Sequence, residues 1–195
     1  MQKQHLEFVR SWVTTNEVIE IWRGIEEELP HWKEFWKAKG YKSWEDWRRD
    51  THKAILQDNL EYGLAWRLYR VKDPLQFFPE CRGGLFHSWA KWFYPQVDCQ
   101  GAETPKLKEL LAHPGVHNHW YIRTIAENFQ TPTTLTAIDL GPDSDAYIIE
   151  GMHRACALTM MATNGAKPPE NISLILGTWS NINSLPRLGA GWEQR

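Results

Sequence analysis

Cysteines are few in this sequence, and their spacing excludes two kinds of small fold. Among 195 residues only Cys81, Cys99 and Cys156 are cysteines, which is an odd number. Their spacing matches neither a disulfide framework nor a zinc ribbon. We therefore expect a fold that depends on a packed core and that resides in a reducing compartment, with the cytoplasm as the simplest choice.

Long apolar runs and an excess of charge of one sign are also missing. No stretch approaches the roughly eighteen apolar residues that a membrane-spanning helix needs. Residues 1–5 (Met-Gln-Lys-Gln-His) lack the apolar core of a signal peptide. The formal net charge is −2, and acidic and basic residues are interspersed. Because a general nucleic-acid binder has a field of positive charge, we expect neither a nucleic-acid partner nor a membrane contact.

Tryptophan, in contrast, is abundant, with 12 in the chain. Five lie between residues 16 and 62, where apolar residues recur at helical spacing. These five are Trp22, Trp32, Trp36, Trp44 and Trp47. The pattern predicts helices over 17–28, 30–39 and 43–61. We expect the tryptophans to form an aromatic core between these helices; the alternative is a platform that stacks a base or docks a protein partner.

From residue 64 onward the sequence predicts a small mixed sheet. Runs that are apolar or that alternate in polarity predict strands over 64–71, 133–140, 146–149 and 172–176. The second and third runs are joined by a turn, which predicts an antiparallel hairpin. The fold class is therefore α+β. We divide the chain into a Trp-rich helical region over residues 1–63 and an α+β domain over residues 64–195.

Two stretches before the hairpin are less regular. Residues 77–95 are rich in Phe and Trp among Pro and Gly, and we expect an irregular segment that packs on the sheet as a lid or pocket wall. Short helices are expected over 104–112 and, with Asn118 as its N-cap, over 118–129.

Three histidines between those two helices raise the question of a metal site. His113 and His117 are four residues apart, as two ligands on one helix would be, and His119 follows closely. Pro114-Gly115 makes a continuous helix between the first two improbable. We assign no metal here and expect a loop that faces substrate or solvent.

The most informative stretch is a strand that runs through a glycine into a helix. Residues 146–149 read as a buried strand and residues 155–162 as a helix, so that Gly151 lies at the switch between them. The first N–H groups of such a helix carry partial positive charge, and His153 and Arg154 add two cationic side chains. Gly151 lacks a Cβ, which allows an anion to approach the backbone. The pattern predicts an anion site.

The same residues carry a family resemblance. The sequence Ile-Glu-Gly-Met-His-Arg over residues 149–154, followed by Ala157, resembles the Gly-x-His-Arg turn of the ParB/sulfiredoxin-like superfamily, which includes the free serine kinases. The resemblance spans residues 66–178 at most and is specific over about ten of them. It implies that Gly151, Met152, His153 and Arg154 bind the phosphates of ATP or another nucleotide.

The departures from the superfamily pattern narrow the choice of branch. Sulfiredoxins have their catalytic cysteine directly before the His-Arg pair, where this chain has Met152, so repair of sulfinic acids is not expected. Cys156 reads as a small buried residue. ParB proteins proper continue into a helix-turn-helix region, for which the chain after Arg154 is too short. The kinase-like branch is the nearest match.

This branch implies phosphoryl transfer, which needs Mg²⁺ and a group that positions the acceptor. Glu150 and His153 are the candidate catalytic residues. Pairing with Arg154 or Arg67 is the structural alternative for Glu150, and Glu80 and Glu127 remain alternatives for the base. We expect a kinase for a small hydroxylated metabolite, or a nucleotide hydrolase. The alternative function is a non-catalytic, nucleotide-gated switch or adaptor that binds a protein partner through its Trp-rich helices.

Overall fold

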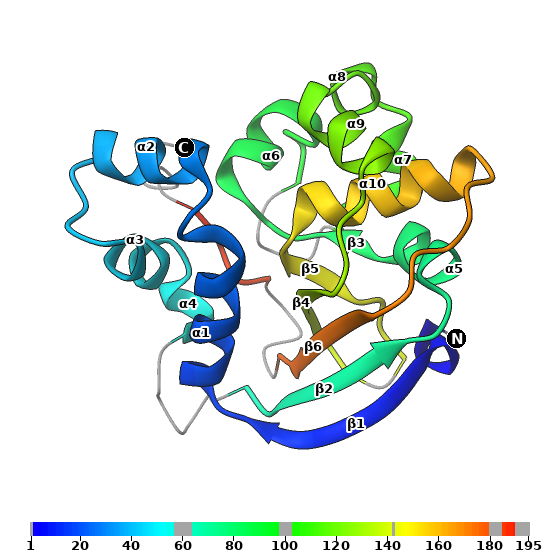
Figure 1. The fold of residues 1–195 in the computed structure, drawn as a ribbon, viewed down its shortest axis with the longest axis horizontal. Helices are drawn as coiled ribbons and strands as arrows, with labels where there is room; N and C mark the ends of the chain where they lie inside the picture. The colour runs from blue at the N-terminus through cyan, green and yellow to red at the C-terminus, as the bar shows by residue number, and fades with distance from the viewer. Residues whose placement is uncertain (1, 57–63, 98–102, 142, 180–184, 190–195) are drawn as a thin grey trace.

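A six-stranded mixed sheet forms the centre of the protein in the computed structural model (Figure 1). The structure describes residues 2–56, 64–97, 103–141, 143–179 and 185–189. The strand order is β1-β2-β6-β4-β5-β3. The strands are β1 (Leu6–Val13), β2 (Trp66–Val71), β3 (Arg82–Gly83), β4 (Thr133–Asp139), β5 (Tyr147–Glu150) and β6 (Ile172–Thr178). The predicted α+β class, in its coarse form, is confirmed.

Strand pairing agrees with the predicted hairpin. β4 and β5 pair antiparallel, with Ala137 opposite Ile148. β2 pairs antiparallel with both β1 and β6. β6 runs parallel to β4, and the short β3 runs parallel to β5. β5 therefore lies between β4 and β3, but β3 pairs only with Tyr147 and Ile148; at the carboxyl end of β5, where the glycine turn begins, Glu150 pairs with Thr136 of β4.

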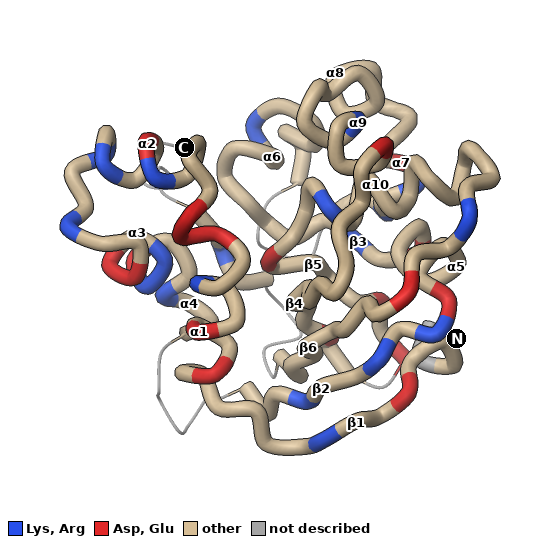
Figure 2. The backbone as a smooth tube through the Cα atoms, viewed as in Figure 1, with Lys and Arg blue, Asp and Glu red and all other residues tan. Residues whose placement is uncertain are grey.

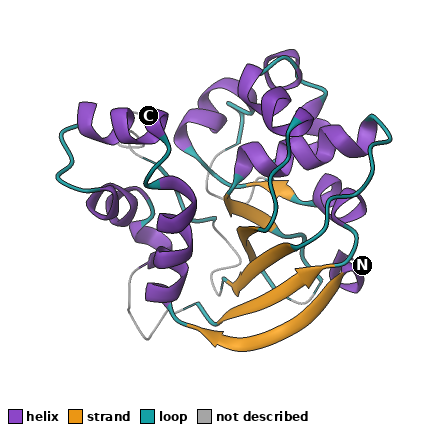
Figure 3. Cartoon of the chain, in the orientation of Figure 1, coloured by secondary structure: helices purple, strands orange, loops and turns teal. Residues whose placement is uncertain are grey.

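Helices lie on both faces of this sheet (Figure 3). The N-terminal group consists of α1 (Thr15–Glu26), α2 (Pro30–Ala38), α3 (Trp44–Thr51) and α4 (Lys53–Leu56). The second group consists of α5 (Pro74–Phe77), α6 (His87–Phe93), α7 (Leu107–Leu111), α8 (Pro114–His117), α9 (Trp120–Glu127) and α10 (Met152–Thr163). Two 3-10 turns, η1 (Gln2–His5) and η2 (Phe78–Glu80), complete the regular structure of the described residues.

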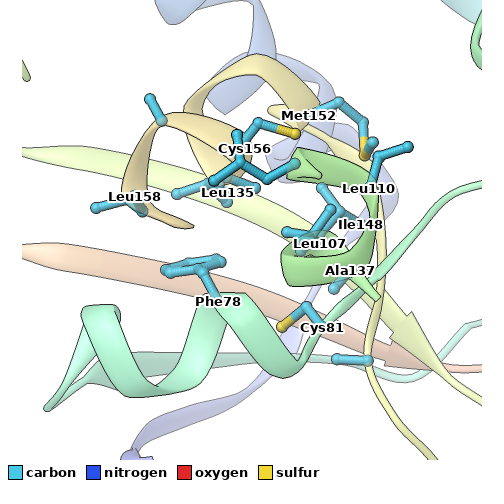
Figure 4. Close-up of a cluster of buried hydrophobic side chains, with 14 of the residues drawn as sticks. Phe78, Cys81, Leu107, Leu110, Leu135, Ala137, Ile148, Met152, Cys156 and Leu158 are labelled. Carbon is cyan, nitrogen blue, oxygen red and sulfur yellow. The ribbon is translucent and has the colours of Figure 1, made fainter. Parts of the chain in front are cut away.

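Two hydrophobic cores follow from this arrangement, one on each face. The larger core lies between the sheet and the second helix group, where Met152 and Cys156 of α10 point towards Leu110 (Figure 4). Successive residues of the central strands alternate between the cores: Ala137 belongs to the larger core and Ile138 to the other. Because both faces of β4, β5 and β6 are covered, these strands read as nearly continuous apolar runs. Cys156 is fully buried, as predicted.

The second core, under α1–α4, is built around tryptophan. Trp22, Trp36, Trp44 and Trp47 are all buried in it, together with Ile138, Tyr147 and Ile149 of the sheet. The indole nitrogen of Trp22 donates a hydrogen bond of 2.8 Å to the hydroxyl of Thr136 on β4. A buried polar group is costly unless it is paired, so this bond fixes α1 on the sheet.

The first part of the chain is not wholly helical. Residues 6–13, which the sequence analysis grouped with the Trp-rich helices, form β1 at the edge of the sheet. Two register shifts against β2, after Phe8 and after Ser11, break the alternation of side chains that predicts a strand. The predicted boundary at residue 63 falls at the end of residues 57–63, outside the described part of the chain.

The helix predicted over 43–61 is shorter than expected. It starts as predicted, because the Ser43 hydroxyl accepts a hydrogen bond from the backbone N–H of Asp46. It ends at Thr51, and a separate turn, α4, follows. His52 leaves the helical conformation, and its buried ring lies 3.3 Å from the carbonyl oxygen of Ile149 on β5. This tertiary contact overrides local helix propensity; the predicted end, 57–61, is outside the described residues.

The aromatic stretch over 77–95 is also more regular than predicted. It contains the end of α5, η2, β3 and α6. Asp73 caps α5, and Pro74 occupies its first turn, where a missing N–H costs nothing. The hydroxyl of buried Tyr94 donates to the carbonyl of Gly84 over 2.6 Å. Burial of the aromatic rings therefore orders a segment that turn residues alone suggest is irregular.

The histidine-rich segment contains a one-turn helix, α8, that includes His117 but not His113, so the two do not lie on one continuous helix, as the sequence analysis held. Pro114 is tolerated because it occupies the first position of α8. His113 caps this turn, since its Nδ1 accepts a hydrogen bond of 3.1 Å from the N–H of Gly115. The cap residue of α9 is His119 and not Asn118. Nowhere in the described part of the chain do three His, Cys, Asp or Glu side chains group so that they could hold a metal ion.

Charges of both signs are interspersed along the chain, as the composition indicates (Figure 2). Among the described residues, none of the helices combines the length and the apolar character that crossing a membrane requires.

Candidate functional site

A cavity of about 480 Å³ lies where the N-terminal helices meet the start of α10. Its size is in the range of small-molecule pockets. The aromatic part of its lining includes Trp32, Phe35, Trp47, Phe86, Trp89 and Tyr121. The polar part includes two ion pairs, Glu26 with Arg48 and Glu150 with Arg154, together with His153. Phe86 and Trp89 come from the aromatic stretch that was expected to form a pocket wall.

Gly151 is the residue that joins β5 to α10. Its φ of 86° and ψ of 25° place it in the left-handed region, as the N-cap of α10. A Cβ at this position would lie 3.0 Å from Nη2 of Arg154 and 3.1 Å from Cγ of Leu135. The predicted reason for this glycine was room for an anion at the backbone. The structure gives another reason: a left-handed backbone conformation that residues with a Cβ rarely adopt, and two side chains already packed against the Cα.

We expect Gly151→Ala to destabilise the fold by about 2 kcal/mol or more, because the left-handed conformation alone costs about 1–2 kcal/mol and the packing adds to it. Gly165→Ala is the matched control, since Gly165 also has a positive φ, 65°, but a Cβ there would meet no atom within 4 Å. Urea denaturation of both variants measures the difference. Equal losses would show that packing around Gly151 adds nothing.

Arg154 reaches from α10 back to the sheet. Its Nη1 donates to the Thr133 hydroxyl over 2.5 Å and to the Thr134 carbonyl over 3.0 Å. Its Nη2 donates to Oε1 of Glu150 over 2.5 Å. The side chain is 15% exposed and lines the cavity. The guanidinium therefore has three protein acceptors before any ligand arrives, which the sequence analysis expected only for Glu150.

Glu150 is the last residue of β5 and is more deeply buried than Arg154. Its side chain is 3% exposed, and Oε2 has no hydrogen-bond partner among the described residues. Burial raises the pKa of this carboxyl group; the Arg154 guanidinium lowers it and the Glu26 carboxylate raises it further. Pairing with Arg154, the structural alternative given above, is what the structure contains.

A second buried ion pair lies beside the first. Arg48 donates from Nε to Oε2 of Glu26 over 2.6 Å, and its Nη2 contacts Oε1 of the same residue. The Arg48 guanidinium also lies 4.4 Å from the centre of the Trp47 ring. The cavity lining therefore carries two carboxylates and two guanidinium groups, whose formal charges cancel, and Lys39 adds one positive charge. Pairing of the two arginines thus weakens the positive field that was expected at the turn.

His153 differs most from its expected role as a cation. Its ring is enclosed by Trp89, His119 and Tyr121, with ring centres 5.2–5.4 Å away. Burial, reinforced by His119, His31 and Arg154, lowers its pKa to about 3. The imidazole is therefore neutral at pH 7 in the free protein, and Arg154 supplies the fixed positive charge of the turn.

Met152 contributes to the site through its backbone. Its side chain is buried and packs in the larger core (Figure 4), so that the N–H at the start of α10 is the group left to face a ligand. Residues 150–154 thus line one cavity together with Glu26, Arg48 and Tyr121, which the sequence analysis did not identify. No local pattern marks these three residues, because they come from α1, α3 and α9.

Comparisons with protein-family models, with curated proteins and with solved structures found no match to this chain. The resemblance to the ParB/sulfiredoxin-like superfamily consequently depends on residues 149–157 alone. Function has to be argued from the chemistry of the cavity.

Proposed function

We propose that the cavity binds a nucleotide and that the protein transfers or hydrolyses its terminal phosphoryl group, as a kinase for a small hydroxylated metabolite. One observation carries this proposal. The turn at residues 151–154 and the aromatic side chains of residues 32–47, remote in sequence, line the same cavity. A nucleotide needs both: N–H groups and a cation for its phosphates, and ring faces for its base.

The phosphates would lie at the first turn of α10. There the free N–H groups carry the positive end of the helix dipole, and Arg154 adds a guanidinium that lines the cavity. Glu150 opposes this attraction. A Mg²⁺ ion that accompanies the nucleotide would screen the phosphate charge, and Oε2 of Glu150, which has no partner among the described residues, is the carboxylate oxygen suited to hold it.

The base would stack in the aromatic part of the cavity. Trp32 and Trp47 lie with ring centres 5.3 Å apart, and Phe35 contacts both rings at 5.8–5.9 Å. Stacking on such side chains is worth about 1–3 kcal/mol per base and tolerates any base. The cavity therefore supports nucleotide binding without indicating which nucleotide is preferred.

Nucleotide turnover is the direct test of this function. The purified protein is incubated with ATP, ADP or CTP and Mg²⁺, with and without a panel of hydroxylated metabolites that includes free serine. We expect consumption of a nucleoside triphosphate that one class of metabolite accelerates, with phosphorylated metabolite as the product. Absence of both binding and consumption for every nucleotide would contradict the proposal.

Phe35→Ala provides a variant test that spares the fold. Phe35 is 44% exposed at the edge of the cavity, so its truncation opens little of the core. We expect nucleotide affinity to fall about 5- to 100-fold, as the loss of one stacking partner predicts. Trp92→Ala is the matched control, because Trp92 is 66% exposed on α6 and does not line the cavity. Equal affinities for the two variants would place the base elsewhere.

The second candidate function is a nucleotide-gated switch or adaptor without turnover. It is favoured by the position of the cavity, whose lining comes both from α1–α3 and from the elements that follow β2. A ligand there contacts both parts and can alter the surface that the Trp-rich helices offer to a protein partner. A nucleotide that raises the melting temperature but is not consumed would favour this candidate over the kinase.

A further inference from the structure

The protonation state of His153 bears on how phosphates can bind at this site. His153 is the second residue of α10, directly beside the N–H groups to which we assign the phosphates. No hydrogen bond reaches its ring nitrogens from the residues that the structure describes. It lines the cavity, so a ligand there can contact the ring.

The groups around His153 come from four elements. His31 lies on α2, where its ring centre is 5.0 Å from that of Tyr121. His119, the cap of α9, and Tyr121 of α9 contact the His153 ring directly. Trp89 of α6 covers the ring on another side and does not titrate in the accessible range. Arg154 is the neighbour on α10.

These neighbours make the empty site unfavourable for an imidazolium ion. None of the groups that contact the ring is a carboxylate, and Glu150 is already paired with Arg154. Burial and three nearby basic groups all disfavour the charged form. A phosphate at the start of α10 reverses this balance, because it brings at least one negative charge beside the ring.

We propose that nucleotide phosphates bind at residues 151–154 together with a proton, which His153 takes up from solvent. This inference rests on the proposed function and specifies how its site is regulated. The imidazolium then donates a hydrogen bond to a phosphate oxygen.

Thermodynamic linkage between proton binding and nucleotide binding fixes the direction in which pH changes the affinity. If binding adds a proton, lowering the pH must strengthen binding, by up to tenfold per pH unit between the pKa of His153 in the free protein and its pKa in the complex. Above the pKa of the complex the effect disappears. The proposed site is therefore stronger in mildly acidic solution, provided the protein stays folded.

Calorimetric titration with ADP and Mg²⁺ tests the proposal. Titrations at pH 6.5 in buffers of different ionisation enthalpy give the number of protons taken up per ADP. The terminal phosphate of ADP also titrates in this range. The proposal is therefore tested by the difference in proton uptake per ADP between the wild type and His153→Gln. We expect the wild type to take up more protons than this variant, by an amount between zero and one, and to lose affinity about 3- to 10-fold from pH 6.5 to pH 7.5.

His117→Gln is the matched control, because His117 is exposed on α8 and does not line the cavity. It should take up as many protons as the wild type. ADP binding with the same proton count in the wild type and in His153→Gln overturns the inference while leaving the proposed function intact. Absence of ADP binding by the wild type contradicts the proposed function itself. Should His153→Gln fail to fold, a wild-type affinity that is flat between pH 6 and pH 8 overturns the inference.

Discussion

Replacing Arg154 with alanine is expected to lower the free energy of unfolding by about 3–5 kcal/mol. The reason is the carboxylate that remains. Glu150 is 3% exposed, and the Arg154 guanidinium is the cation that contacts it. Without that cation a buried charge has no partner, and the hydroxyl of Thr133 and the carbonyl of Thr134 lose their donor as well. Urea denaturation at pH 7 measures the loss.

A double variant separates the buried charge from the lost packing. In Glu150→Leu/Arg154→Met both charges are removed and the apolar volume is kept, so most of the stability should return. Arg70→Ala is the surface control: Arg70 is 65% exposed and lies 3.9 Å from Glu7, and its loss should cost at most about 0.5 kcal/mol. If Arg154→Ala costs less than about 1 kcal/mol, the ion pair is not buried as described.

The expected loss of stability makes Arg154→Ala a poor test of nucleotide binding. A variant that loses several kcal/mol can lose nucleotide binding through unfolding alone. Phe35→Ala is the safer test of the cavity, because the side chain is at the surface and no buried charge depends on it.

Acidification is the second change with a large expected effect: from pH 7 to pH 5 the free energy of unfolding should fall by about 2 kcal/mol or more. Burial lowers the pKa of His52 well below its usual range, and the pKa of His153 to about 3. In the unfolded chain both titrate near 6.5. The unfolded state therefore binds more protons below pH 6.5, so the stabilisation is complete above that pH and is lost as the pH falls towards the folded-state values. With its folded-state pKa of about 3, His153 contributes about 2 kcal/mol over this interval, and His52 acts in the same direction.

Denaturation by urea at pH 7, 6 and 5 gives the slope of the free energy of unfolding against pH. His153→Gln should make the slope smaller, since glutamine does not titrate, whereas the exposed His117→Gln should leave it unchanged. The carboxylates with lowered pKa values, such as Glu45 and Glu80, titrate below this interval and do not account for the loss. A stability that is constant between pH 7 and pH 5 would mean that neither ring is buried in its neutral form.

Much of the fold could be predicted from the sequence where local chemistry decides. Four of the five described strands after residue 63 were identified because buried or alternating apolar runs have few other interpretations; the two-residue β3 was missed. The start of α3 was identified from Ser43, whose hydroxyl caps the helix. β1 was missed because two register shifts hide its alternation, and the end of α3 was missed because His52 turns away to contact β5.

In the candidate site, too, some features follow from local sequence and others from tertiary contacts. The amino-acid sequence by itself determined that a strand, Gly151 and a helix follow one another, since propensity and the left-handed preference of glycine act within a few residues. Only the tertiary structure decided what this turn offers a ligand. Glu150 and Arg154 are paired, and His153 is neutral, because buried charges respond to groups that folding brings from distant segments, among them Glu26, His31 and His119.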